Sequence, residues 1–221
     1  MGAVNPRPSK GGGVLPRRQQ RSLVTAGQIL AAASAEFAAK GLAGARVDEI
    51  ARRAGVNKRM LYHYFGNKEA LWLAVLEHAY DGIRKEERGL DVGRLPPEEG
   101  MRRLVEFSVR YCADHPEFLT LLNSENLHKA KYLKRSTRMP ELHSALLQVI
   151  ADLLERGQRA GVFRQEVDPA ELYIHIAALG FFYFSNIHTL SVIFERDLNA
   201  PRTRRRHIKQ AAEVILGYLR P

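Results

Sequence analysis

The chain has 221 residues, of which 45% are hydrophobic, so it is long enough to bury a core in one compact domain or two small ones. Its single cysteine excludes an internal disulfide, and no Cys and His residues have the spacing of a zinc site. The sequence has neither a run of about 18 apolar residues nor a signal-peptide h-region, so it predicts a cytoplasmic protein without a membrane partner.

The net charge of +10 is concentrated near the N-terminus. Residues 1–70 carry 12 Lys and Arg against 4 Asp and Glu, whereas residues 71–221 carry 22 against 20. A basic end joined to a nearly neutral remainder is typical of a chain that binds a polyanion. Residues 1–21 are rich in Pro, Gly and Arg, which predicts a flexible basic arm. The arm is solvated by default, although its arginines, Arg17, Arg18 and Arg21, could reach a minor groove.

After the arm, helical periodicity never gives way to an alternating strand pattern, so the sequence predicts an all-α fold of about nine helices. The first helix is expected from about Ser22 to Lys40, with Gly41 at its end. A short second helix is expected over 47–54, and Gly55 supplies its left-handed C-terminal cap.

The stretch "GVNKRMLYHYF", residues 55–65, predicts a short third helix. Asn57 is a good N-cap, and Leu61 and Phe65 lie four residues apart on the inward face. Four large polar side chains then point outward: Lys58, Arg59, Tyr62 and His63. Two short helices joined by a glycine turn are typical of a helix-turn-helix, whose second helix must fit a major groove about 12 Å wide.

The segment "FAAKGLAGARVDEIARRAGVNKRMLYHYFGNKEAL", residues 37–71, carries the pattern A-G-V-(S/N)-x-x-x-L-Y-x-(Y/H)-F-x-x-K-E-x-L. It resembles the N-terminal domain of TetR/AcrR-type transcriptional regulators. The resemblance implies that 47–54 is the positioning helix, that 57–64 is the recognition helix, and that Lys68 contacts a phosphate.

The chain departs from the family pattern at Ala45, where members commonly have Thr or Ser. The hydroxyl expected to cap the second helix is therefore missing, and Arg46 can replace a phosphate contact but not the cap. The candidate DNA-binding residues are Arg46, Asn57, Lys58, Arg59, Tyr62, His63 and Lys68.

A long helix is expected to begin after Asn67, a good N-cap, and to link this region to the remainder. Prolines divide the following chain into helices near 97–114, 117–134 and 141–160. Asp168, at an N-cap position before Pro169, marks the start of an aromatic-rich helix, and a last helix is expected near 201–218.

The aromatic-rich helix contains "FFYF" at 181–184, more apolar surface than one helix face can bury internally. Together with the last helix it is expected to form an isologous four-helix interface between two subunits, and the family resemblance places dimerisation at the same end. The candidate interface residues are Tyr173, Phe181, Phe184, Ile208, Ala212 and Ile215.

The C-terminal part is also loosely similar to the regulator subgroup that includes the pyrimidine-utilisation repressor, too loosely to assign a pyrimidine ligand. The family resemblance implies a ligand cavity in this part, whose occupation changes the separation of the two DNA-binding heads. The candidate lining residues are Phe107, Tyr111, Leu122 and Asn126. No cofactor is expected, and Cys112 is interpreted as a small core residue.

The enzyme hypothesis has no organised support, because the chain lacks a G-x-S-x-G elbow, an H-E-x-x-H motif and a phosphate loop. The sequence thus predicts a helix-turn-helix domain at 22–67 and a helical effector-binding and dimerisation domain at 68–221. The expected protein is a homodimeric, nucleoid-associated repressor that binds a palindromic operator and is released by a small-molecule effector. The alternative is a dimeric ligand-binding scaffold of the same fold that has lost DNA binding.

Overall fold

The computed structural model describes residues 17–221, and side chains from residue 20 on. Over that range the protein is helical, with ten α-helices, two short 3-10 helices (η) and no strand. The predicted all-α fold is therefore confirmed, with ten α-helices where about nine were expected. Most of the predicted arm, residues 1–16, lies outside the described residues. Residues 17–21 already belong to the first helix, so the predicted arm is too long.

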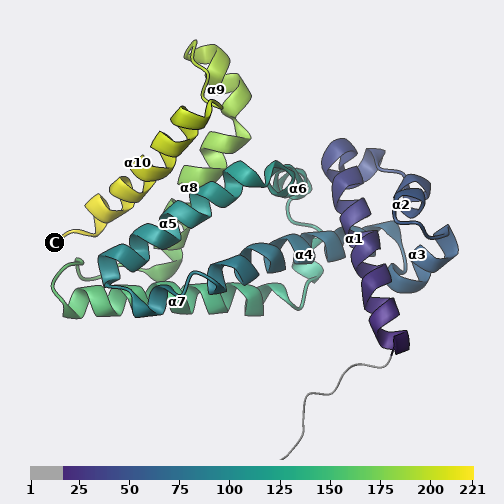
Figure 1. The fold of residues 1–221 in the computed structure, drawn as a ribbon, viewed down its shortest axis with the longest axis horizontal. Coiled ribbons are helices and arrows are strands. Elements are labelled where there is room, and N and C mark those ends of the chain that lie inside the picture. Colours follow the sequence, from purple (N-terminus) through teal and green to yellow (C-terminus); the bar gives the residue numbers. More distant parts are fainter. Residues whose placement is uncertain (1–16) are drawn as a thin grey trace, which may run out of the picture.

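Three helices form the N-terminal module at the right of Figure 1: α1 (Arg17–Gly44), α2 (Val47–Arg53) and α3 (Lys58–Phe65). Gly41 has a φ of 66° and interrupts the helical dihedrals of α1 where the sequence predicts the helix end. Gly55, also at φ 66°, supplies the left-handed turn between α2 and α3.

From this module, α4 (Lys68–Arg88) runs into the rest of the protein, where it lies alongside α7 (Figure 1). The remaining elements are η1 (Val92–Arg94), α5 (Pro97–Asp114), α6 (Pro116–Leu127), η2 (Leu133–Arg135), α7 (Met139–Arg159), α8 (Pro169–Ser185), α9 (Ile187–Ile193) and α10 (Pro201–Leu219). The short helix α9 joins α8 to α10 at the end that points away from the rest of the molecule (Figure 1).

The expected helix over 117–134 is wrong at its C-terminal end, because α6 stops at Leu127. Lys129 and Ala130 then adopt left-handed dihedrals, with φ 55° and 56°. The carboxylate of Glu125 accepts hydrogen bonds from the backbone N–H groups that follow this turn, so a tertiary contact overrides the local helical pattern.

The buried side chains form two clusters that meet along α4. The N-terminal cluster is built around Phe37 and Trp72, whose rings meet edge to face with centroids 5.1 Å apart. It also takes in Leu121 from α6 and Tyr132 from the turn before η2. The second cluster fills the space among α4, α5, α7, α8 and α10. The α6–η2 segment therefore fastens the C-terminal helices to the N-terminal module.

Two parts of the described chain are long and apolar enough to resemble a membrane span by composition: Gln20–Gly44 in α1, and α8 with α9 taken together across a 68° bend. Each contributes side chains to the protein core. Phe37 of α1 is fully buried in the N-terminal cluster, and Leu172 and Ile176 of α8 are buried in the other.

Candidate nucleic-acid interface

The position of α3 is set by its caps and by one buried side chain. Asn57 Oδ1 accepts a hydrogen bond from the N–H of Met60 at 2.8 Å, so the predicted N-cap is confirmed. Leu61 is fully buried, which anchors the inner face of the helix to the module's core. The opposite face is exposed and presents Lys58, Arg59, Met60, Tyr62 and His63.

The two cations of this face differ in their partners. Lys58 Nζ lies 3.0 Å from Oδ1 of Asp48 on α2, and this hydrogen-bonded contact raises the pKa of Lys58 above its usual value. Arg59 makes no hydrogen bond or ion pair with any described residue. Arg59 is thus free to engage a ligand, whereas Lys58 is held towards α2.

Replacing Asp48 with Asn is expected to strengthen DNA binding several-fold on cognate and random duplexes alike. The change removes a negative charge beside the exposed face and releases Lys58 to neutralise a phosphate, a contact that is independent of sequence. Fluorescence anisotropy titrations at several salt concentrations measure the effect, and Asp81→Asn on α4 is the matched control. Unchanged or weaker binding by Asp48→Asn would contradict an interface that includes Lys58.

The start of α2 has no side-chain cap, as the sequence predicts from Ala45. Ala45 is buried and precedes the N-cap, which is Arg46, and Arg46 makes no side-chain cap. Oε1 of Glu36 on α1 accepts a hydrogen bond from the backbone N–H of Arg46 at 3.3 Å. This contact ties the start of α2 to α1, but it does not replace a hydroxyl cap, which would accept from an N–H group of the first turn.

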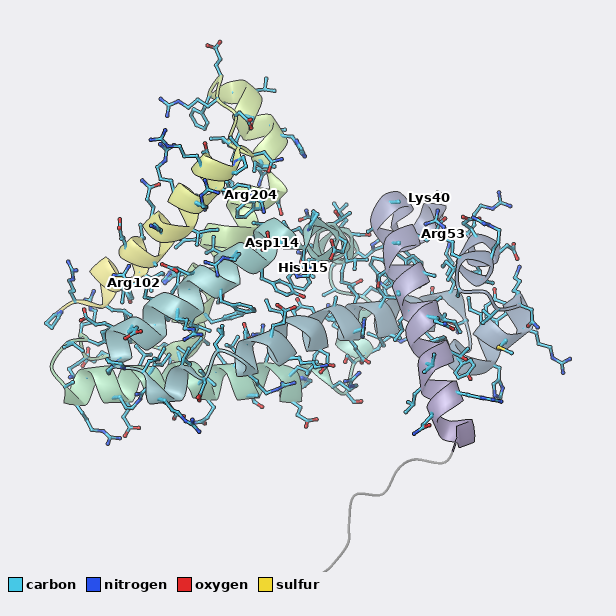
Figure 2. All side chains as sticks on the ribbon, in the orientation of Figure 1. Lys40, Arg53, Arg102, Asp114, His115 and Arg204 are labelled. Carbon is cyan, nitrogen blue, oxygen red and sulfur yellow. The ribbon has the colours of Figure 1, made fainter. Side chains whose placement is uncertain are left out.

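Glu36 is fully buried, and its carboxylate is paired with two cations that lie close together in Figure 2. Lys40 Nζ is 2.8 Å from Oε1, and Arg53 Nη2 is 3.4 Å from Oε2. The hydrogen bond from Lys40 is the main cause that holds the pKa of Glu36 below its usual value. This buried carboxylate joins α1 to both ends of α2 and so fixes the helix that supports α3.

A second carboxylate, Glu49, restrains the arginines of α2. Arg52 donates to both its oxygens, at 2.6 and 2.9 Å, and Arg53 donates to Oε1 at 2.7 Å. The hydrogen bond from Arg52 is the largest cause that lowers the pKa of Glu49 to about 2. Both arginines are exposed, but their side chains already donate hydrogen bonds to Glu49. They are therefore weaker candidates for DNA contact than Arg59.

The two flanking candidates lie at helix starts on either side of α3. The side chain of Arg46 is exposed and has no ion-pair or hydrogen-bond partner among the described residues. Lys68 Nζ donates to the carbonyl of Ala43 at 3.2 Å, near the C-terminal end of α1. Met60, whose side chain is 41% exposed, is a surface residue of α3 that the sequence analysis missed, because helical spacing alone did not place it outside.

One cavity of the C-terminal part lies apart from the predicted lining residues. It measures about 240 Å³ and is lined by residues of α4, η1, α5 and α7, none of which is Phe107, Tyr111, Leu122 or Asn126. Tyr111 is buried and stacks on His115 with ring centroids 4.0 Å apart. Phe107 and Leu122 are half-buried, and Asn126 is exposed. The predicted pocket residues therefore contribute to core contacts or to the surface.

The predicted interface residues are mostly buried within the chain itself. Ile208, Ala212 and Ile215 belong to the core cluster that includes α5, and Phe184 is only 9% exposed. Tyr173 and Phe181 are half-buried, and the Tyr173 hydroxyl accepts a hydrogen bond from Arg84 at 3.1 Å. The periodic apolar face of α10 thus covers the subunit's own core.

The surface of α8 and α10 nevertheless holds an open apolar groove of about 470 Å³. It is lined by His175, Ala178, Leu179, Phe182, Tyr183, His207, Val214, Ile215 and Tyr218. Phe182 is 61% exposed and Val214 57%, so these side chains are free to meet a partner.

Cys112 lies inside the subunit, beside Gly180 of α8. Burial raises the pKa of its thiol to about 11, so it stays protonated near neutral pH. Cys112 therefore has the features of an inert core residue, as the sequence analysis interpreted it.

Comparison with known proteins places this arrangement in a family. Residues 29–75 match the model of bacterial regulatory proteins of the tetR family, and residues 97–215 match the tetracyclin repressor-like C-terminal domain. The chain belongs to the tetR family. As a member of this family it is a DNA-binding transcriptional regulator and not an enzyme, and α2–α3 is its helix-turn-helix.

Individual members of the tetR family align over most of the chain. The transcriptional repressor NicS of Pseudomonas putida is 39% identical over 181 residues, which cover 82% of this chain and 85% of NicS. The repressor SCO4008 of Streptomyces coelicolor is 31% identical over 158 residues, covering 70% and 76%. The crystal structure of the regulator SCO4942 from the same species, 25% identical, superposes with a TM-score of 0.65 over 86% of this chain and 97% of SCO4942.

Proposed function

We propose that this tetR-family protein is a homodimeric repressor that binds a palindromic operator in the cytoplasm, on the nucleoid, and leaves it when a small-molecule effector binds. Residues 22–67 form the DNA-binding head, and residues 68–221 bind the effector and the second subunit. The observation that carries the proposal is the exposed face of α3, with the unpaired Arg59, on a helix that is capped and anchored from behind. The relatives NicS and SCO4008 are both repressors, which supports the direction of regulation.

The contacts divide into two kinds by their chemistry. Lys58, Lys68 and Arg46 neutralise phosphates and supply affinity. Arg59 reads a guanine through its forked donors, and Tyr62 and His63 add single hydrogen bonds to base edges. Met60 supplies an apolar contact that suits a thymine methyl group.

The dimer is built on the apolar groove of α8 and α10. An isologous contact places the same two helices of both subunits together, and it covers the exposed Phe182 and Val214. Each DNA-binding head then faces one half-site, with the half-sites about one helical turn or a multiple of it apart.

The first experiment is selection of bound sequences from a random duplex library with the full chain, followed by a salt titration on the selected site. Recovery of an inverted repeat with a steep salt dependence is the expected result. Weak binding without sequence preference by a folded dimer would overturn the proposal and favour the scaffold alternative.

Arg59→Ala is expected to lower affinity for the selected operator by about 1–3 kcal/mol and to relax preference at one base pair. Lys68→Ala, the comparison variant, is expected to weaken all duplexes alike and to reduce the salt slope. Affinities for the operator, its single-base variants and a random duplex measure the difference. An equal loss on operator and random DNA for Arg59→Ala would contradict its role in reading sequence.

Release by an effector requires that the effector prefer the arrangement of the heads that does not fit the operator. The helix α4 is suited to carry this preference, because Asn67 Oδ1 caps its first turn directly after α3, at 2.8 Å from the N–H of Ala70. Its other end lines the cavity of the C-terminal part. A shift of α4 therefore moves the start of this helix, which follows directly after α3.

A further inference from the structure

The outer side of α10 carries a row of four exposed cations. Counted from Arg202, the other three follow three, four and seven residues later, so all four lie on one side of the helix. We call this row the cationic stripe, and its members are Arg202, Arg205, Arg206 and Lys209. Together they line one shallow depression of the surface, which Gln210 and Glu213 complete.

The cations of the stripe have no partner among the described residues. No carboxylate oxygen of that part of the chain lies within 4.0 Å of a stripe nitrogen, and no stripe side chain donates a hydrogen bond to it. Arg204, from the same stretch, instead donates to Asp114 at 2.9 Å and to the carbonyl of Ala113 at 2.8 Å, and it lies close to Asp114 in Figure 2. Arg204 therefore holds α10 against α5, whereas the stripe makes no such contact.

The acidic residues near the stripe do not balance its charge. Residues 195–213 contain six Lys and Arg against three Asp and Glu. Asp197 accepts hydrogen bonds from the backbone N–H groups of Asn199 and Ala200, at 2.9 and 3.0 Å, in the turn before α10. Glu213 is exposed one helical turn after Lys209 and forms no ion pair with it. The positive charge of the stripe is therefore available to a partner.

The stripe works against the stability of its own helix. Positions 202 and 209 each have positions 205 and 206 three or four residues away, and like charges at these spacings disfavour a helix. The first turn of α10 also has no acidic residue, although the N-terminal end of a helix favours negative charge. Sequences break such local rules mostly at functional sites. The arrangement thus indicates an anionic partner, which would relieve this repulsion.

The stripe points away from the proposed dimer contact. On α10, the apolar groove of that contact includes His207, Val214 and Tyr218. These positions are two, five and nine residues from Lys209, which is a rotation of roughly 140–180° about the helix axis. Pairing of α8 and α10 between two subunits therefore leaves one stripe exposed on each subunit.

The chemistry of the stripe fits phosphates better than a protein or a membrane surface. Three of its four members are arginines, whose forked donors match phosphate oxygens. Protein interfaces have an apolar core, and helices that lie on membranes have an apolar face. The residues that complete the depression, Gln210 and Glu213, are polar. Protein–DNA interfaces are both polar and strongly positive, as this surface is.

We propose that the cationic stripe binds the phosphate backbone of a second DNA duplex, independently of its sequence. In Figure 1 α10 lies in the left half of the molecule, whereas α3 lies at the right end of its longest axis. DNA is stiff over roughly 150 base pairs, so the short site on α3 does not bend back to the stripe. The protein therefore joins two DNA segments, which goes beyond the proposed function.

The first test removes DNA binding by the head, with Lys58→Gln, Arg59→Gln and Lys68→Gln combined in the full chain. This head variant is expected to keep salt-dependent binding to a random duplex, measured by fluorescence anisotropy. Neutralising the stripe as well is expected to lower that affinity about tenfold or more and to reduce the salt slope by about 3–4, since each phosphate contact contributes about 0.9. The stripe set consists of Arg202→Gln, Arg205→Gln, Arg206→Gln and Lys209→Gln.

Two further sets separate the stripe from net charge and from damage to α10. The control set neutralises four exposed cations elsewhere and is expected to leave the affinity of the head variant within about twofold. The lysine set keeps the charge of the stripe and is expected to bind more tightly than the stripe set. Equal losses in the control and stripe sets, or a lysine set as weak as the stripe set, overturn the proposal. The control set is Lys85→Gln, Arg103→Gln, Lys131→Gln and Lys134→Gln, and the lysine set is Arg202→Lys, Arg205→Lys and Arg206→Lys.

Two other anionic probes identify the class of partner. They are a polyglutamate peptide and vesicles that contain phosphatidylglycerol, each titrated against the head variant with and without the stripe set. Binding of either probe through the stripe, together with no binding of the duplex, overturns the DNA proposal in favour of an acidic protein or a membrane surface.

Joining of two duplexes is measured with the head intact. Beads that carry the selected operator hold the protein, and a labelled random duplex is then added. The parent and the control set are expected to retain the second duplex, and the stripe set is expected to lose it. Equal retention by the stripe set overturns the joining role. Absence of any selected operator refutes the proposed function and not the stripe, because the titrations with the head variant need no operator.

Discussion

Glu125→Leu is expected to lower the free energy of unfolding by about 3–5 kcal/mol. Glu125 is only 4% exposed, and its carboxylate accepts three hydrogen bonds. Trp72 Nε1 donates at 2.8 Å, and the N–H groups of Tyr132 and Leu133 donate at 2.9 and 2.8 Å. A leucine leaves all three donors without an acceptor in a region that water does not reach.

The effect should be specific to the contact between α4 and the α6–η2 segment. Glu117→Leu, at a side chain that is 47% exposed on the same helix, is the matched control and is expected to change stability by less than about 0.5 kcal/mol. Glu125→Gln keeps one acceptor oxygen and is expected to fall between them. Urea unfolding followed by tryptophan fluorescence measures the series, since Trp72 is the only tryptophan. Equal losses for the two leucine variants would contradict this account.

Gly157→Ala is expected to destabilise the protein by about 2–3 kcal/mol. A Cβ atom at Gly157 would lie 1.9 Å from Cδ2 of the Phe163 ring and 2.5 Å from two further ring atoms. Phe163 is 2% exposed and belongs to the C-terminal core, so the ring cannot move without displacing its neighbours. Thermal and urea unfolding measure the loss.

The control for this change is Gly27→Ala in α1, where a Cβ atom would have nothing within 4 Å. Alanine is the better helix former, so Gly27→Ala is expected to stabilise the protein by about 0.5–1 kcal/mol. Two identical substitutions should therefore act in opposite directions. A stabilising Gly157→Ala would show that α7 and Phe163 are placed differently from this structure.

The N-terminal module could be predicted from the sequence because its signals are local. The caps at Asn57 and Asn67 each depend on a side chain and a backbone N–H three residues later, and both are present at 2.8 Å; the cap at Asp168 in the C-terminal part has the same local signal and the same distance. The left-handed glycine at Gly55 is equally local. A dense family pattern over the same residues then identified the helix-turn-helix.

The C-terminal sites depend on which helices meet, and periodicity cannot supply this information. Ile208, Ala212 and Ile215 do form an apolar face, but α5 of the same chain covers most of it, and of these three only Ile215 also borders the exposed groove. The buried contacts of Arg84 depend on α4 and α8 together, because its Nη2 donates to the hydroxyl of Tyr173. The role of Glu125 has no local sequence signal, because its partners lie on α4 and beyond the end of α6.

The buried Cys112 makes the separation of the two DNA-binding heads measurable in the proposed dimer. It is the only cysteine of the chain, and its protonated thiol inside the core is a poor target for thiol-reactive labels. A cysteine introduced at an exposed position of α1, such as Ala39→Cys, then becomes the single labelled site of each subunit. In the proposed dimer this gives one pair of spin labels, and the distance between them reports how far apart the two DNA-binding heads are held with and without operator DNA.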